Sequence, residues 1–236
     1  MRSPREILGA NLERLRNRIS NAAGRAGRSV EDVRLVAVTK EVEVEIAREL
    51  FDLGVKDLGE NRPQELWRKR SLMDRPVSWH LVGTLQRNKA RRTLPLVDWI
   101  HSVDSSDLLR RLDSLAMEME LKPRVLLQVN TSGEATKHGF SLSEMAQAMP
   151  AISELRQVHV RGFMTMAPYD EQPERVREYF ARLRDLRDYW AGRAPAHCPL
   201  TELSMGMSGD FELAIEEGAT MIRIGSALFE GLVNPT

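Results

Sequence analysis

The stretch Leu35-Val36-Ala37-Val38-Thr39-Lys40, followed by the segment Val44 to Leu53, decides the fold of this chain. The first part is a short β-branched run, and the second has apolar residues at helical spacing, so together they predict one strand followed by one helix. With this first strand, eight strand-like runs recur along the chain. The other seven are Val55 to Leu58, Ser78 to Val82, Val97 to Ile100, Val125 to Val129, Val158 to Met164, Leu200 to Ser204 and Met221 to Ile224.

Helical patterns fill most of the gaps between these runs, most clearly at Asp107 to Glu120, Pro173 to Trp190 and Asp210 to Glu217. Eight strand–helix repeats predict an α/β fold, a TIM-type (β/α)8 barrel, with an open doubly wound sheet as the alternative. A helix of about residues 3–23 is expected before the first strand, ended by Gly24 and Gly27. Its apolar stripe consists of Ile7, Leu8, Leu12, Leu15 and Ile19.

The composition is that of a globular protein that binds a small partner. Of the 236 residues, 42% are hydrophobic and 29% charged, which suffices for a core, so we expect a single domain over residues 1–236. Lys plus Arg and Asp plus Glu both number 34, so no net charge attracts nucleic acid or an anionic membrane. With Cys198 as the only cysteine, no intrachain disulfide can form, and no secretion signal or membrane-spanning run is evident, so a cytoplasmic location is expected.

Polar residues follow several of the predicted strands. In (β/α) barrels the reactive groups lie where strands end and the following loops begin, so these residues are the first candidates for a site. They are Thr39-Lys40, Gly59-Glu60-Asn61, Asn130-Thr131-Ser132, Ser204-Met205-Gly206-Met207-Ser208 and Gly225-Ser226.

Two cations are expected to share the barrel mouth. Side chains alternate along a strand, so Lys40 follows the face of Val36 and Val38, and Arg223 lies on the face of Met221. If these faces point inward, the two cations need an anionic ligand or an internal carboxylate. An alternative remains open, in which Lys40 is a solvated strand end and Arg223 pairs with Glu202.

The loops after the seventh and eighth strands indicate the kind of ligand. Their glycines allow close backbone approach, and their N–H groups at helix starts suit a phosphate group. A ligand with a phosphate on these loops and a carbonyl reaching Lys40 across the mouth has the shape of pyridoxal 5'-phosphate (PLP). Its aldehyde forms a Schiff base with lysine, and burial favours the uncharged amine that this reaction requires.

Motifs in a fixed order carry a family resemblance that runs from about residue 5 to 232. The chain resembles the pyridoxal phosphate homeostasis protein family, single-domain relatives of the alanine racemase barrel, which is the PLP fold of type III. The motifs are Leu35-Val-Ala-Val-Thr-Lys40, Gly59-Glu-Asn-Arg-Pro-Gln-Glu-Leu66, Trp79-His-Leu-Val-Gly83 with Gln86 and Asn88-Lys89, Gln128-Val-Asn-Thr-Ser-Gly-Glu134, Leu203-Ser-Met-Gly-Met-Ser208 and Ile222-Arg-Ile-Gly-Ser226.

The resemblance implies a role for each candidate residue. Lys40 would form the covalent aldimine with PLP, and Arg223 would face the pyridine nitrogen. Gly225 and Ser226, with Ser204, would hold the phosphate, and Asn61 and His80 would line the pocket. No metal site is implied.

Two of these assignments have plain alternatives. Asn61 precedes Arg62-Pro63 and could instead cap a helix, since proline suits a helix's first turn. His80 lies in a strand and could be a core histidine. The chain also departs from the commoner family pattern at Thr39, Pro63, Thr84 and Glu230, and Pro63 and Thr84 could reshape the loop over the cofactor.

A conventional catalytic role is not expected, and no catalytic residue is assigned. An arginine beside the pyridine nitrogen keeps that nitrogen unprotonated, which makes the ring a poorer electron sink. Racemisation needs a second base, and in the alanine racemase relatives it comes from an additional β domain, whereas this chain ends soon after the eighth strand. Tyr169, Tyr179 and Tyr189 fall after the sixth strand or on its helix, where no replacement base is expected.

The leading hypothesis, implied by the resemblance, is a protein that buffers or delivers PLP in vitamin B6 and amino-acid homeostasis. PLP-dependent apoenzymes are its possible partners, and a monomer or weak dimer is expected. The runner-up is a PLP-dependent racemase or lyase of low activity. A third hypothesis is nucleic-acid binding through the basic run Arg87, Lys89, Arg91 and Arg92, although such a run is more often a solvated helix face.

Overall fold

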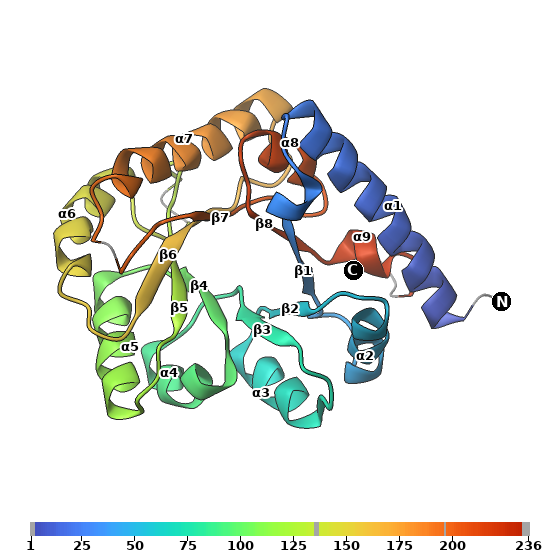
Figure 1. The fold of residues 1–236 in the computed structure, drawn as a ribbon, viewed down its shortest axis with the longest axis horizontal. Helices are drawn as coiled ribbons and strands as arrows, with labels where there is room; N and C mark the ends of the chain where they lie inside the picture. Colours follow the sequence, from blue (N-terminus) through green and yellow to red (C-terminus); the bar gives the residue numbers. More distant parts are fainter. Residues whose placement is uncertain (1–2, 135–136, 196, 233–236) are drawn as a thin grey trace.

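The fold is a closed barrel of eight parallel strands in sequence order (Figure 1). The computed structural model describes residues 3–134, 137–195 and 197–232. Because β8 pairs with β1, the predicted TIM-type barrel is confirmed and the open doubly wound sheet is excluded. The strands are β1 (Arg34–Val38), β2 (Asp57–Glu60), β3 (Ser78–Leu81), β4 (Trp99–Val103), β5 (Arg124–Gln128), β6 (His159–Met164), β7 (Glu202–Ser204) and β8 (Met221–Ile224).

Helices surround the strands, as a (β/α) barrel requires (Figure 1). Among the described residues they are α1 (Pro4–Arg25), α2 (Val44–Asp52), α3 (Pro63–Leu72), α4 (Arg87–Thr93), α5 (Ser106–Glu118), α6 (Leu142–Ile152), α7 (Pro173–Ala191), α8 (Phe211–Glu216) and α9 (Ser226–Phe229), with short 3-10 turns η1 (Val30–Asp32) and η2 (Leu94–Leu96).

The added N-terminal helix is present and lies along the outside of the barrel beside α8 and α9 (Figure 1). Its predicted end was wrong, because Gly24 lies inside α1 and the helix continues to Arg25. Only Gly27 acts as the stop: its φ of 65° is in the left-handed region, and the Arg28 N–H turns back to the Ala23 carbonyl.

Three strands start later than the sequence predicts by more than a single residue, each for a local reason. Val55 closes the end of α2 through a hydrogen bond from its N–H to the Leu50 carbonyl, so β2 starts only at Asp57. Val97 follows the turn η2, which delays β4 to Trp99. Leu200 has a φ of 48°, outside the β region, so β7 starts after it.

The barrel interior contains two small apolar clusters. One contains Val36, Val38 and Val82, and the other contains Trp99, Leu126, Met164 and Met221. Val36 and Val38 are alternate residues of β1, and both clusters are separate from the core between strands and helices, so the faces of Val36 and Met221 point inward. Helix packing against the outside of the strands forms the larger core.

A glycine on β6 permits the strands to close. A Cβ on Gly162 would lie 1.9 Å from the Glu202 carbonyl oxygen on β7, which no side chain tolerates. No described helix is long and apolar enough to cross a bilayer. Because residues 1–2 and 233–236 lie outside the described part, the domain bounds 1–236 stay a prediction.

Candidate cofactor site

A cavity of about 650 Å³ opens where the strands end at their carboxyl side. The structure brings five of the seven predicted site residues to its wall. They are Lys40, Asn61, Arg223, Gly225 and Ser226. They come from the ends of β1, β2 and β8, so residues far apart in sequence meet because the barrel closes β8 against β1.

Lys40 stands at the rim of this cavity and is more exposed than expected. Its side chain is 49% exposed, and its Nζ lies 3.2 Å from Glu41 Oε1. This exposure agrees with the alternative in which Lys40 is a solvated strand end, because β1 ends at Val38 and Lys40 lies in the turn that follows. The amine is accessible from both the cavity and solvent.

Arg223 is the buried cation of the site. Its Nη1 donates to Ser204 Oγ at 2.6 Å and its Nη2 donates to the Thr165 carbonyl at 2.9 Å. Burial lowers the pKa of Arg223 to about 10, partly opposed by the Asp210 carboxylate, so the guanidinium stays charged at neutral pH. The alternative pairing with Glu202 is wrong, because the Glu202 carboxylate instead accepts from Thr220 Oγ1 at 2.7 Å.

Asn61 is a cavity residue and not a helix cap. The N-cap position of α3 is Arg62, whose side chain makes no capping hydrogen bond, and Pro63 lies in the first turn. The backbone of Asn61 packs closely against Gly83, since a Cβ on Gly83 would lie 2.1 Å from the Asn61 carbonyl oxygen. The glycine of the third-strand motif thus sets how closely the loops after β2 and β3 approach.

Two predicted residues do not line the cavity. Ser204 is fully buried below Arg223, where its Oγ is occupied by Arg223 and by His101 Nδ1 at 2.8 Å. His80 is fully buried inside the barrel, with Nδ1 2.9 Å from His101 Nε2 and Nε2 2.9 Å from Asp57 Oδ1. Phosphate contact by Ser204 and a pocket position for His80 are corrected, because both side chains point into the barrel.

Ser208, rather than Ser204, is the serine of this motif that lines the cavity. It lines the cavity beside Gly225 and Ser226, and its Oγ accepts a hydrogen bond from the Ala227 N–H at 3.3 Å, which links the loops after β7 and β8. Ser208 closes the Met-Gly-Met-Ser motif, so the sequence contained the signal. The family resemblance pointed to Ser204 at the strand end and not to Ser208 in the loop.

Asp210 also lines the cavity. Burial raises the pKa of its carboxyl group, while a hydrogen bond from the Met207 N–H and the charge of Arg223 oppose that rise. Tyr169, set aside in the sequence, lines the cavity from the loop after β6, with its side chain in the open. Tyr179 is buried and donates to Glu171 Oε2 at 3.2 Å, and Tyr189 lies on α7.

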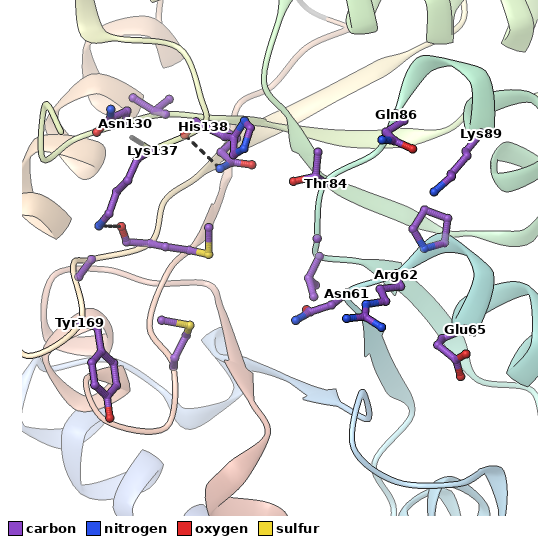
Figure 2. Close-up of a pocket in the computed structure, with 18 of the residues that line it drawn as sticks. Asn61, Arg62, Glu65, Thr84, Gln86, Lys89, Asn130, Lys137, His138 and Tyr169 are labelled. Atoms are coloured by element: carbon purple, nitrogen blue, oxygen red, sulfur yellow. Dashed lines mark hydrogen bonds between the residues drawn. The ribbon is translucent and has the colours of Figure 1, made fainter. Parts of the chain in front are cut away.

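A second cavity of about 930 Å³ adjoins the first and shares Asn61 and Tyr169 with it. Figure 2 shows Asn61 and Arg62 on one side of this space, with Lys137 and Tyr169 on the other. Thr84, one of the departures from the family pattern, stands on its wall. Arg62, Lys89 and Lys137 therefore line the second cavity, which adjoins the first.

The basic run on α4 is engaged within the fold. Arg91 pairs with Glu118, Arg92 lies over the ring of Trp67 and Arg87 Nη1 lies 3.5 Å from Asp107 Oδ2. Lys89 lines the second cavity. These contacts tie α4 to α3 and α5, which favours the helix-face interpretation over a nucleic-acid surface. Among the described residues, no cluster of three or more His, Cys, Asp or Glu could hold a metal ion.

The buried histidines predict a pH dependence of stability. Burial lowers the pKa of His80, against the opposing effect of Asp57, and burial lowers that of His101 well below its ordinary value. Below about pH 6.5 the unfolded histidines bind protons that the folded rings do not. The contribution of the two neutral histidines to the free energy of unfolding is therefore fully present above that pH and is lost as the pH falls below it.

The free energy of unfolding should decrease by up to about 1.4 kcal/mol per pH unit for each ring in this range. Urea denaturation between about pH 7.5 and 5.5 measures the slope. A His101→Leu variant should show a shallower slope than the parent protein. Equal slopes in the two proteins would contradict burial of a neutral His101.

Comparison with known proteins first defines the class. The pattern of the "Alanine racemase, N-terminal domain" family matches residues 10–232. An alanine racemase from Clostridium difficile, in complex with cycloserine, superimposes with a TM-score of 0.76 at 19% identity, covering 98% of this chain and 60% of the racemase. The protein is thus an alanine-racemase-type (β/α) barrel.

Closer relatives define the particular family. A pyridoxal phosphate homeostasis protein from Aquifex aeolicus is 42% identical over 219 residues, or 92% of this chain and 95% of the relative. The structure of PipY from Synechococcus elongatus with PLP bound has a TM-score of 0.84 at 37% identity, covering 94% of this chain and 99% of PipY. The chain belongs to the pyridoxal phosphate homeostasis protein family.

Proposed function

We propose that this protein binds PLP reversibly at the 650 Å³ cavity, with the aldehyde held covalently on Lys40, and buffers or delivers the cofactor. One observation carries the proposal. A single cavity brings together an accessible primary amine, a buried guanidinium and hydroxyl groups on two adjoining glycine-containing loops. An aldehyde, a pyridine nitrogen and a phosphate are the three groups that such a set would recognise.

The residues present fit the cofactor. Arg223 would donate to the ring nitrogen, and because arginine keeps its proton, that nitrogen would stay unprotonated. Ser208, Ser226 and the backbone of Gly225 would hold the phosphate. A Cβ at Gly225 would lie only 3.3 Å from the Val38 carbonyl, so glycine keeps this wall open. PLP would supply an electrophilic aldehyde and a conjugated ring.

The exposure of Lys40 supports exchange rather than permanent retention. A rim amine that contacts solvent allows water or a second amine to reach the linkage. The adjoining cavity, with Arg62 and Lys89 on its wall, provides a cationic approach for an anionic cofactor. Reversible holding followed by transfer to PLP-dependent apoenzymes, by a cytoplasmic monomer or weak dimer, is the function that we propose.

A low-activity racemase or lyase remains the second candidate, because the structure brings Tyr169 to the cavity. Its side chain is 93% exposed, and among the described residues no hydrogen bond fixes its hydroxyl over the cavity. A racemase requires an oriented acid or base on each face of the substrate. Amino-acid turnover by the purified protein that is lost in Lys40→Ala would favour this candidate.

Borohydride reduction of the PLP-loaded protein, followed by peptide mapping, tests the proposal. Reduction traps a lysine adduct as a stable secondary amine, and we expect it on the peptide that contains Lys40. If PLP is dialysed away before reduction, the adduct on Lys40 should be lost, which measures how reversibly PLP is bound. Labelling confined to other lysines, or no labelling at all, would overturn the proposed site.

A further inference from the structure

A line of buried polar side chains crosses the barrel interior below Arg223. Arg223 Nη1 lies 2.6 Å from Ser204 Oγ, which lies 2.8 Å from His101 Nδ1. His101 Nε2 lies 2.9 Å from His80 Nδ1, and His80 Nε2 lies 2.9 Å from Asp57 Oδ1. The line starts at the cavity on β8 and passes through β7, β4 and β3 to the amino end of β2.

The two ends of this line fix the direction of every hydrogen bond in it. Arginine can only donate, and an ionised aspartate can only accept. Ser204 accepts from Arg223 and passes its own proton to His101 Nδ1. A neutral His101 then carries its proton on Nε2 and donates to His80 Nδ1, and His80 likewise donates from Nε2 to Asp57.

The opposite direction is unfavourable. If His101 donated from Nδ1 to Ser204, its Nε2 would need a proton from His80 Nδ1. The Nε2 lone pair of a neutral His80 would then face the Asp57 carboxylate, unless His80 were charged or Asp57 protonated. His80 is fully buried, and burial lowers its pKa, which disfavours the charged ring.

We infer that Ser204, His101, His80 and Asp57 are positioning residues that act as one hydrogen-bonded chain to fix Arg223 beneath the cofactor cavity. The chain connects a buried cation to a carboxylate at the opposite end of the barrel, through three neutral groups. It holds the guanidinium in one orientation, because Nη1 has Ser204 as its acceptor and Nη2 has the Thr165 carbonyl. The effect on the cofactor rests on the proposed function, whereas the chain itself does not.

Asp57 is the outer end of the chain. Its side chain is 23% exposed and lies 3.9 Å from Arg34 Nε. Trp99 stacks on His80 with ring centroids 6.0 Å apart, and Arg34 and Arg124 lie over Trp99. These rings and cations cover the amino end of the barrel and shield the histidines from water.

Nitrogen NMR of the ligand-free protein tests the chain directly. The chemical shifts and two-bond couplings of the imidazole nitrogens report which nitrogen carries the proton. We expect His80 and His101 both to be neutral with the proton on Nε2, unchanged between about pH 6 and 8. A proton on Nδ1 of either ring, or a charged ring, would overturn the chain as drawn.

Two variants test whether the chain acts on the cavity. Ser204→Ala removes the link next to Arg223, and His80→Leu removes one that is separated from Arg223 by Ser204 and His101. His80 does not line the cavity. We expect PLP to bind about 10-fold more weakly to Ser204→Ala and about threefold more weakly to His80→Leu. The absorption maximum of bound PLP should shift in both. In His80→Leu, His101 should also populate the Nδ1 tautomer.

Leu126→Ala is the matched control, because Leu126 is an apolar residue of the barrel interior outside the chain. It should lower the thermal midpoint without changing the histidine tautomers or the PLP spectrum. If His80→Leu and Leu126→Ala affect PLP affinity and spectrum alike, the chain is only structural. If the parent protein does not bind PLP, the proposed function fails. The histidine tautomers would still show whether the hydrogen-bonded chain from Arg223 to Asp57 exists.

Discussion

Replacing Lys69 by methionine is expected to lower the free energy of unfolding by about 3–5 kcal/mol. Lys69 and Glu60 form an ion pair with Nζ 2.6 Å from Oε1, and their side chains are 1% and 0% exposed. Removing the lysine leaves a buried carboxylate whose remaining hydrogen bond comes from Thr39 Oγ1. Urea denaturation, monitored by circular dichroism and tryptophan fluorescence, measures the loss.

Two further variants separate the ion pair from the loss of a lysine. Lys122→Met changes an exposed lysine and should leave stability within about 0.5 kcal/mol of the parent. The double variant Lys69→Met/Glu60→Leu should recover part of the loss, because it leaves no unpaired charge. A Lys69→Met protein as stable as Lys122→Met would contradict the ion pair.

The Lys69 pair also connects stability to the site. Lys69 Nζ donates to the Thr39 carbonyl at 2.5 Å, directly before Lys40, and Glu60 directly precedes Asn61. The buried pair therefore joins the ends of β1 and β2 where two cavity residues begin. Thr39, a departure from the commoner family pattern, donates its hydroxyl to Glu60 Oε1 at 2.6 Å and takes part in the same network.

Replacing Lys40 by alanine is expected to abolish the borohydride-reducible PLP adduct. The Lys40 amine is the one among the described lysines that lines the 650 Å³ cavity, so no described neighbour there can replace it. Phosphate and ring contacts would remain, and PLP should still bind weakly and without covalent attachment. Absorption spectra, before and after reduction, distinguish these two forms of bound cofactor.

Lys89→Ala is the control for Lys40→Ala, because Lys89 lines only the adjoining cavity. It should keep the adduct and change at most the rate of PLP entry or release. A Lys40→Arg variant keeps the charge near Glu41 but provides no Schiff-base nucleophile, so it should also lose the adduct. Retention of a full adduct in either Lys40 variant would contradict the assignment.

The eight strands could be predicted from the sequence because each depends on a local pattern, whereas the pairing of β8 with β1 decided between the barrel and the open sheet. The alternation of side chains along β1 and β8 correctly predicted that Val36 and Arg223 point into the barrel. The boundaries were less predictable. Val55 and Leu200 are apolar and suit a strand. Val55 instead ends α2 through its hydrogen bond to Leu50, and the positive φ of Leu200 keeps it out of β7.

The site could be predicted only in part, because its contacts join strands that are distant in sequence. Lys40, Asn61, Arg223, Gly225 and Ser226 reach the cavity as expected. Ser204 and Ser208 belong to the same motif, and spacing alone did not show which serine faces the ligand loops. Whether Lys40 is buried or solvated was left open by the sequence, since it depends on where β1 ends and the following turn begins.

The sequence by itself predicted the barrel, the family, and Lys40 and Arg223 as residues at the barrel mouth, because strand alternation and ordered motifs are properties of the chain. Only the tertiary structure decided which polar residues meet. Asp57, His80, His101 and Ser204 come from four strands and form one line because the closed barrel directs their side chains to a common interior. Hydrogen bonding across that interior depends on distances of about 3 Å, which the order of residues does not specify.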